Sequence, residues 1–211
     1  MYLTRVEIDT EDRRKARSLT HLGAFHNWVE QSFPGEFTQG IRSRKLWRID
    51  QLCGKKYLMI LSESMPDTKA LETYGKEGSA QCKNYDAYLQ RLREGERLRF
   101  RLVANPVHAV AEQKGMRGVE RPHITIQHQL DYLMKRTEKN GFHISEDEVC
   151  IVERGYEVLR KQGSKQVRVV KVAYEGILTI TDIGKFRHAL VNGIGKKKAY
   201  GFGLLTVIPE G

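Results

Sequence analysis

Residues 193–205, GIGKKKAYGFGLL, decide how the rest of the chain is interpreted. Three lysines stand between two glycine pairs, and the residues are Gly193, Gly195, Lys196, Lys197, Lys198, Gly201 and Gly203. Glycine permits positive φ and close approach to a partner, and backbone N–H groups in such a turn, flanked by ammonium groups, form a phosphate site. The simpler alternative is a glycine-rich turn with solvated lysines, between a helix and an apolar last strand. Both interpretations stay open, but a Walker A loop is excluded because no Gly-Lys-Ser or Gly-Lys-Thr occurs.

The charge of the chain favours a polyanionic partner. Its 211 residues contain 36 Lys and Arg against 26 Asp and Glu, a formal net charge of +10. Such an excess is typical of proteins that bind nucleic acid or an anionic membrane surface. The length suits one large domain or two domains of about 100 residues each.

Several classes of protein are disfavoured by the composition. No apolar run reaches the roughly 18 residues that span a membrane, and MYLTRVEIDT at the start lacks the apolar region of a signal peptide. Cys53, Cys82 and Cys150 form no CxxC pair, which predicts free thiols in a reducing, cytoplasmic setting. His123 and His128 are not at a helical ligand spacing, so we expect no structural metal.

The first half of the chain predicts the element order βαββαβ. Residues 2–8 alternate and predict a strand, and residues 9–17 predict a charged turn. An amphipathic helix follows, ended by Pro34 and capped by Ser18 or Thr20, with apolar residues at steps of three and four: Leu19, Leu22, Phe25, Val29 and Phe33. Strands at residues 45–50 and 56–61, a short helix at 66–74 and a strand at 79–85 complete the half.

The same order is predicted again after a connection at residues 86–96. RLRFRLV at residues 97–103 alternates strictly and predicts a strand. A helix at 125–139 ends at Gly141, and a long hairpin pairs residues 142–159 with 166–180. A helix at 182–191 and a strand at 204–208 follow. The sequence therefore predicts an α+β fold of two tandem ferredoxin-like (βαββαβ, RRM-like) domains, at residues 1–92 and 93–211.

Three separated basic segments favour nucleic acid over a membrane as the partner. Arg97, Arg99 and Arg101 share one face of a predicted strand. The predicted hairpin carries Arg160, Lys161, Lys165 and Arg168, and no acidic residue occurs between residues 185 and 209. The alternative for each segment is an ordinary solvated face.

Four motifs together resemble a known family. They are MYLTRV at the start, LRFRLVANP at residues 98–106, YEGILTI at 174–180 and GIGKKKAYGFGLLTV at 193–207. The chain resembles the CRISPR repeat-processing endoribonuclease of the CasE type, a RAMP-superfamily protein and subunit of the subtype I-E Cascade. The resemblance implies metal-independent cleavage of CRISPR precursor RNA at the 3′ base of the repeat stem-loop, without a cofactor. It also implies a retained product and other Cascade subunits as partners. We expect no membrane contact, and a monomer when the protein is free.

The resemblance implies that His26, on the first helix, is catalytic. Cleavage through the RNA 2′-hydroxyl needs one proton removed and one supplied, and histidine, with a usual pKa of about 6.5, can do either. His26 also borders the apolar stripe of its helix, so a packed helix-edge histidine is the alternative.

One departure from the family concerns the partner of His26. Family members often carry a tyrosine three residues before the histidine, where this chain has Gly23. His21 is predicted to face elsewhere on the helix, and a lysine of the glycine-rich loop, Ser18 or Thr20 are the candidates left. A non-catalytic RNA-binding subunit of the same fold, or a domain that binds small nucleotides, are the alternative functions.

Overall fold

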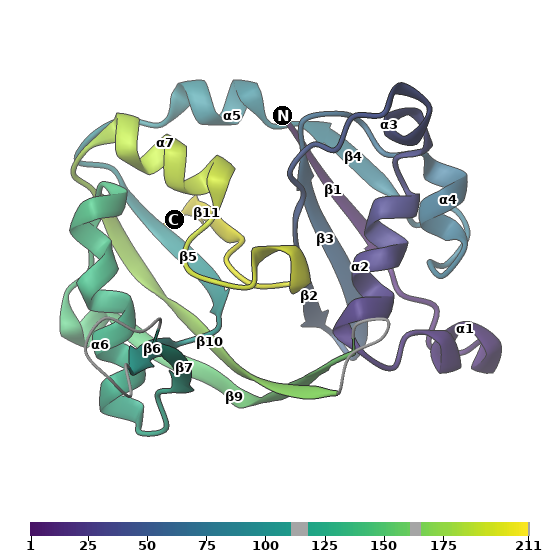
Figure 1. The fold of residues 1–211 in the computed structure, drawn as a ribbon. Helices are drawn as coiled ribbons and strands as arrows, with labels where there is room; N and C mark the ends of the chain where they lie inside the picture. Colours follow the sequence, from purple (N-terminus) through teal and green to yellow (C-terminus); the bar gives the residue numbers. More distant parts are fainter. Residues whose placement is uncertain (111–117, 161–165, 211) are drawn as a thin grey trace.

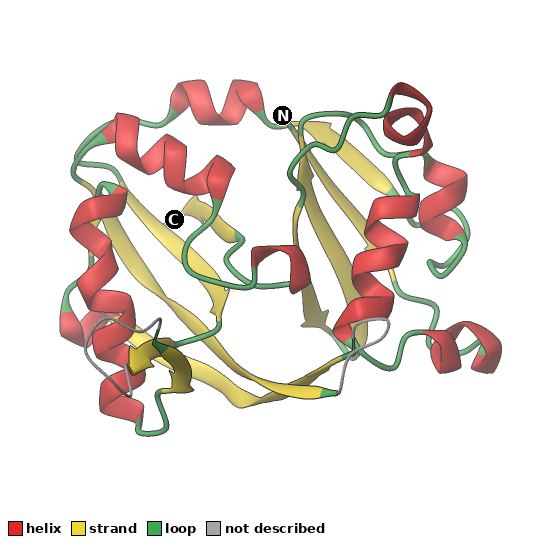
Figure 2. Ribbon diagram, in the orientation of Figure 1, coloured by secondary structure: helices red, strands yellow, loops and turns green. Residues whose placement is uncertain are grey.

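Two structural units lie side by side, each built around one antiparallel sheet (Figure 1). The structure is a computed structural model and describes residues 1–110, 118–160 and 166–210. Both units combine helices with strands, as Figure 2 shows. The mixed α+β architecture predicted from the sequence is confirmed.

The first unit has the sheet order β2-β3-β1-β4. Its elements are β1 (Tyr2–Glu7), α1 (Arg13–Ser18), α2 (Leu22–Gln31), α3 (Pro34–Gln39), β2 (Leu46–Leu52), β3 (Lys55–Ser62), α4 (Thr68–Glu72) and β4 (Gln81–Asn84). Helices α2 and α4 pack against each other on one face of the sheet, where Trp28 Nε1 donates to the Leu71 carbonyl (3.1 Å). The two crossovers, β1-α2-β2 and β3-α4-β4, are those of the split βαβ arrangement.

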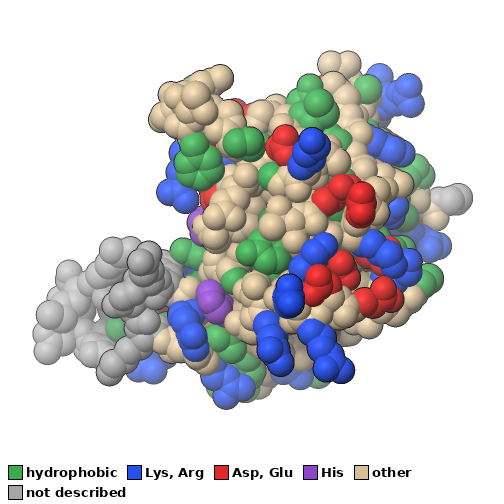
Figure 3. Space-filling model, turned by 90° about the vertical axis from the view of Figure 1, so that its right-hand side faces the viewer, with side chains coloured by type: hydrophobic (Ala, Val, Ile, Leu, Met, Phe, Trp, Pro, Cys, Tyr) green, Lys and Arg blue, Asp and Glu red, His purple; other side chains and the backbone are tan. Residues whose placement is uncertain are grey.

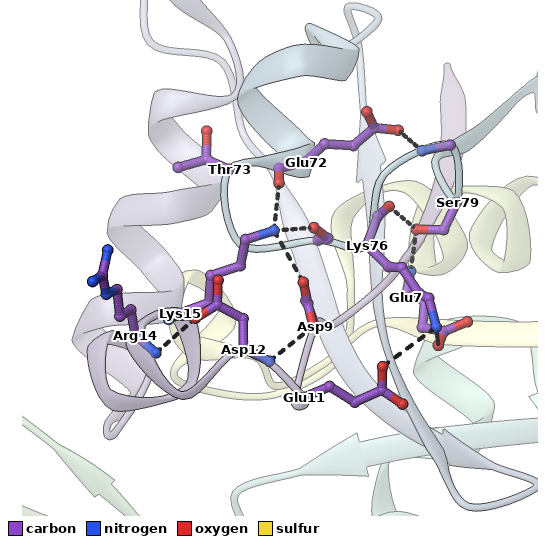
Figure 4. A network of polar contacts seen from close by, with 12 residues as sticks. Glu7, Asp9, Glu11, Asp12, Arg14, Lys15, Glu72, Thr73, Lys76 and Ser79 are labelled. Carbon is purple, nitrogen blue, oxygen red and sulfur yellow. Dashed lines mark hydrogen bonds and ion pairs between the residues drawn. The ribbon is translucent and has the colours of Figure 1, made fainter.

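Helix α1 occupies the segment predicted as a charged turn. Asp12 caps it by accepting from the N–H groups of Arg14 and Lys15. Lys15 Nζ donates to the Gly75 carbonyl (2.9 Å) and pairs with Asp9 (3.1 Å), which ties the helix to the chain after α4 (Figure 4). The prediction was wrong because α1 buries no residue, so it has no apolar periodicity to reveal it.

The N-cap of α2 is His21, not Ser18 or Thr20. Its Nδ1 accepts from the Ala24 N–H at 3.1 Å, the capping role that a serine or threonine oxygen usually performs. Pro34 ends the preceding helix as predicted, and it also begins α3.

The second unit repeats the strand order of the first. Between the units, α5 (Asp86–Arg91) occupies part of the predicted connection. The sheet order is β11-β5-β10-β8, with β9 also paired to β10. The strands are β5 (Arg97–Ala104), β6 (Val107–Val110), β7 (Val119–Pro122), β8 (Phe142–His143), β9 (Val149–Leu159), β10 (Val167–Ile180) and β11 (Leu205–Pro209), and the α-helices are α6 (Ile126–Thr137) and α7 (Ile183–Asn192).

Two features of the second unit differ from the prediction. The strands β6 and β7 form a small hairpin that was not predicted. The segment predicted as one strand over residues 142–159 is broken by the 3₁₀ turn η2 (Glu146–Glu148). Further 3₁₀ turns are η1 (Glu138–Asn140) and η3 (Lys198–Tyr200). The break lies over Gly176, where a Cβ would meet the Glu148 carbonyl oxygen at 2.0 Å.

The two units pack against each other through shared cores. One buried cluster joins Leu46 of β2 to the second sheet, and another joins Val103 and Phe202 to the first unit. Arg48, only 3% exposed, donates to the carbonyls of Arg101 and Leu204 (both 3.0 Å). A buried guanidinium needs such partners, so β2 is fixed to the second unit.

We propose a domain boundary after residue 92, between α5 and β5, because each sheet takes its strands from one side of that point. Within the described ranges, no helix is both long and apolar enough to cross a membrane.

Candidate active site between the two units

A cavity of about 700 Å³ opens between the units beside α2. The first unit contributes residues of α2 and of the segment that follows it, and the second contributes two side chains. The lining residues are His21, Gly23, His26, Asn27, Glu30, Glu36, Phe37, Gly40, Ile41, Arg42, Arg160 and Tyr200. The end of β9 reaches this place from the second unit (Figure 1).

His26 lies at the wall of this cavity with its side chain 21% exposed. Its Nδ1 is 3.9 Å from Glu30 Oε1, and its Nε2 is 3.4 Å from an Arg42 nitrogen. Burial lowers the pKa of His26 below its usual value, against the opposing charge of Glu30. A histidine with a lowered pKa is neutral at pH 7, the form that accepts a proton.

The two carboxylates near His26 are held by cations. Lys45, whose side chain is 1% exposed, lies 2.6 Å from Glu36 and 3.7 Å from Glu30. Burial raises the pKa of Glu36, but hydrogen bonds from Lys45 and Ser43 outweigh this effect and lower the pKa to about 2. Glu30 also pairs with Arg42 at 3.2 Å. Glu36 is therefore ionised at neutral pH, and both carboxylates are engaged in ion pairs.

Gly23 has a structural reason to be glycine. A Cβ at this position would lie 2.2 Å from the backbone oxygen of Arg160, at the end of β9. The turn of α2 that precedes His26 therefore packs directly on the backbone of the second unit. Arg160 itself faces the cavity and donates to Gln166 (3.1 Å), whereas Lys161 and Lys165 lie outside the described residues.

The glycine-rich loop packs against aromatic side chains of the protein. A Cβ on Gly201, which has φ +83°, would lie 2.7 Å from the Trp47 ring, and one on Gly195 would lie 2.5 Å from the Tyr132 hydroxyl. The Ile194 N–H donates to the Gly203 carbonyl (2.9 Å) and the Gly203 N–H to the Val103 carbonyl (2.7 Å). Gly193 likewise approaches the Gly203 carbonyl. Packing thus accounts for these glycines, and phosphate binding by the loop stays a prediction.

The lysines of the loop have partners within the protein. Lys196 and Lys197 pair with Glu120 of β7 at 3.0 and 3.4 Å. Lys198 donates to the Asn192 carbonyl (2.8 Å), and burial lowers its pKa. Although no acidic residue occurs in this stretch of sequence, its lysines therefore have partners in the folded chain.

The arginines of β5 are also partly compensated. Arg97 pairs with Glu148 and Glu210, and Arg101 pairs with Asp50 and Glu175. Arg99 is exposed on the same strand. In the hairpin, the Arg168 guanidinium lies 4.9 Å from the centre of the exposed Tyr156 ring. RNA binding by these arginines stays a prediction, with Arg97 and Arg101 the most strongly engaged by the protein itself.

Acidic and basic side chains are interspersed on the first unit as well. Figure 3 shows this side of the molecule, where lysine and arginine side chains lie beside acidic ones. This face of the molecule therefore carries charges of both signs, although the chain as a whole has a net charge of +10.

Sequence reasoning missed several residues of the cavity. His21 was predicted to face elsewhere, but it lines the same cavity as His26 because it is the N-cap and lies outside the helical repeat. Tyr200, in η3, brings its ring to a centroid distance of 5.1 Å from His26. The position of Tyr200 within the glycine-rich loop was the sequence feature that could have indicated its role. Arg42 lies in no motif that could have identified it.

A second histidine group lies away from the cavity. His123 is within 4.6 Å of His108 and 5.8 Å of His128 between ring centroids. In the parts of the chain that the structure describes, no set of three or more His, Cys, Asp or Glu side chains is arranged to hold a metal ion.

The family described as CRISPR associated protein matches residues 1–209. The chain belongs to this family. It is 30% identical to the CRISPR-associated endoribonuclease Cse3 of Thermus thermophilus, over 99% of this chain and all of that protein. The resemblance drawn from the four motifs is thereby confirmed.

Solved structures of Cse3 and of a CRISPR surveillance complex share the fold. A CRISPR endoribonuclease Cse3 bound to a 19-nucleotide RNA matches with a TM-score of 0.79 and 28% identity, over 99% of both chains. Thermus thermophilus Cse3 bound to an RNA that represents a pre-cleavage complex matches with 0.81 and 27%, over 99% of this chain and 98% of the other. A chain of a CRISPR RNA-guided surveillance complex, 22% identical with a TM-score of 0.70 over 99% of this chain and all of that one, shares the fold alone.

Proposed function

We propose that this protein is an endoribonuclease that cleaves CRISPR precursor RNA at the 3′ base of the repeat stem-loop. The cut uses the RNA 2′-hydroxyl and no metal, and the enzyme keeps its product as a subunit of a Cascade-type complex. The observation that carries the proposal is a half-buried histidine with a lowered pKa at the wall of an open cavity that also holds two arginines. The relatives, an endoribonuclease and its RNA complexes, support the same substrate class.

The neutral His26 takes the proton from the 2′-hydroxyl. The resulting oxygen attacks the adjacent phosphorus, and the bond to the 5′-oxygen breaks. The products are a 2′,3′-cyclic phosphate and a 5′-hydroxyl, after a second group has supplied a proton to the 5′-oxygen. Arg42, with its side chain 72% exposed, brings positive charge to the cavity, where negative charge develops on the phosphate oxygens. Arg160, which follows β9, also lines the cavity and binds the RNA there.

A non-catalytic RNA-binding subunit is the second candidate. It is favoured by Gly23, because α2 carries no side chain at the position where relatives often have a tyrosine. Such a subunit would bind the repeat RNA and leave it intact.

Single-turnover cleavage of the repeat RNA from the neighbouring CRISPR array tests the proposal. In excess EDTA we expect cleavage to continue, with 5′-hydroxyl and 2′,3′-cyclic phosphate ends. Replacing the 2′-hydroxyl upstream of the cut by hydrogen should stop it, because the nucleophile is gone. Loss of cleavage in EDTA that Mg²⁺ restores would contradict the mechanism, and tight binding without any cleavage would favour the second candidate.

A further inference from the structure

We propose that Tyr200, contributed by the second unit, is the second catalytic side chain and donates the proton to the departing 5′-oxygen. This inference rests on the proposed endoribonuclease function and names the group that the function leaves open. It makes the active site composite, with the base on α2 and the acid on the glycine-rich loop.

The position of Tyr200 is the first reason. Its ring centroid lies 5.1 Å from that of His26, the two rings are inclined by 57°, and both line the cavity. A phosphate group in the cavity would therefore have an imidazole and a phenol beside it. Cleavage through the 2′-hydroxyl needs one proton-transfer group for the attacking oxygen and one for the leaving oxygen.

The loop that carries Tyr200 is fixed on both sides of it. The Ala199 carbonyl accepts from Trp47 Nε1 at 3.0 Å, and the same carbonyl lies close enough to His26 to act against the lowering of its pKa. Gly201 packs against the Trp47 ring. The backbone on both sides of Tyr200 is thus anchored, and one of the two anchored residues lies close to His26. Catalytic groups need such fixed positions.

The other described groups of the cavity fit the acid role less well. Glu36 is ionised at neutral pH and Glu30 is held by Arg42 and Lys45. Arg42 does not release a proton in proteins. His21 uses Nδ1 as the N-cap of α2.

The candidates named from sequence, which are Ser18, Thr20 and the loop lysines, are not among the residues that line the cavity. Lys196 and Lys197 pair with Glu120, Lys198 donates to Asn192, and Ser18 donates to the Arg14 carbonyl. Among the residues that approach His26, Tyr200 alone combines a transferable O–H proton with this position within the described structure.

The step balances without a co-reactant. His26 accepts the 2′-hydroxyl proton, the 2′-oxygen forms a bond to phosphorus, and the bond from phosphorus to the 5′-oxygen breaks. The Tyr200 O–H proton passes to that oxygen, which leaves as a 5′-hydroxyl. The phenolate then recovers a proton, and the imidazolium releases one through solvent, so both groups return to their starting forms.

The test compares Tyr200→Phe with wild type on two RNAs, one with the natural 5′-oxygen at the cut and one with sulfur in its place. A thiolate leaves without a proton, so the sulfur RNA does not need an acid. We expect Tyr200→Phe to cleave the natural RNA about 100-fold more slowly and the sulfur RNA within a few fold of wild type. Tyr57→Phe, on β3 and outside the cavity lining, is the matched control and should behave as wild type on both.

Two results would overturn the inference alone, and they are distinguishable from failure of the proposed function. Wild-type cleavage of the natural RNA by Tyr200→Phe removes the phenol from the mechanism. Equal slowing on both RNAs assigns Tyr200 to positioning and not to proton donation. Failure of the wild-type protein to cleave, or full activity of His26→Ala, overturns the proposed function itself.

Discussion

The two units have the same strand order but contribute differently to the site. The first unit provides an intact helix, α2, with His26 on its exposed border. The second provides backbone and loop: the Arg160 carbonyl against Gly23, and the Ala199 carbonyl and Tyr200 against His26. Repetition of the fold has therefore not repeated the site. Its cavity exists only where the second unit packs on α2, and changes at that contact should matter most.

Among variants that change the contact between the two units, the largest effect is expected from a change in the glycine-rich loop. Gly201→Ala places a Cβ 2.7 Å from the Trp47 ring at φ +83°, so the loop must leave Trp47 and take Tyr200 with it. We expect single-turnover cleavage to fall about 100-fold. Rates measured with saturating enzyme check this.

Gly54→Ala is the matched control for that variant. Gly54 also has positive φ, +77°, but a Cβ there meets nothing within 4 Å. It should lose about 1 kcal/mol of unfolding free energy and cleave normally. If both variants lose cleavage equally, the loss in Gly201→Ala does not come from the contact between the units at Trp47.

A smaller effect is expected from the basic hairpin of the second unit. Replacing Arg160 and Arg168 together by glutamine should weaken RNA binding and reduce the salt slope by roughly 0.7–0.9 per lost phosphate contact. Cleavage at saturating enzyme should change far less. Binding titrations across a salt series give both quantities.

The control removes the same charge from the first unit. Arg13 and Arg17 lie at exposed positions of α1, and their double glutamine variant should keep the wild-type slope. If the two double variants behave alike, the hairpin is a solvated face and does not grip the RNA.

The smallest effect concerns the pH dependence of cleavage. The base must be neutral, so the rate should rise with pH through the His26 pKa, which burial holds below its usual value. Arg42 lowers this pKa and Glu30 raises it. Arg42→Ala should therefore move the acidic limb to higher pH and Glu30→Gln to lower pH, each by about one unit or less.

Arg44→Ala serves as the control for the pH series. Arg44 is two residues from Arg42 but contacts Asn192 at 3.3 Å, so its loss should leave the limb in place. Shifts of the same sign in Arg42→Ala and Glu30→Gln would show that another group governs the profile.

The sequence predicts the fold better than it predicts the site. Strict alternation, such as RLRFRLV in β5, and apolar steps, as in α2, correspond to buried faces, so the strands and long helices were found. Helix α1 was missed because its stability comes from Asp12 and Lys15 and not from an apolar stripe. The hairpin β6–β7 carried no clear alternation.

Half of the site depends on contacts that no local pattern contains. His26 was found through the resemblance, and the chemistry of the reaction requires such a residue. Tyr200 lies 174 positions further along the chain, and only the packing of η3 against α2 brings the two rings together. The partners of Arg97 and Lys196 are also distant in sequence, so the sequence did not show that these charges are compensated within the protein.

The most direct measurement compares His26→Ala with wild type on the repeat RNA, following cleavage under single turnover and RNA affinity in the same samples. A residue that transfers a proton acts on the chemical step. We therefore expect the variant to lose cleavage by about 1,000-fold or more and to bind the RNA within a few fold of wild type. Substantial cleavage by His26→Ala at full RNA occupancy would contradict an active site built around this histidine.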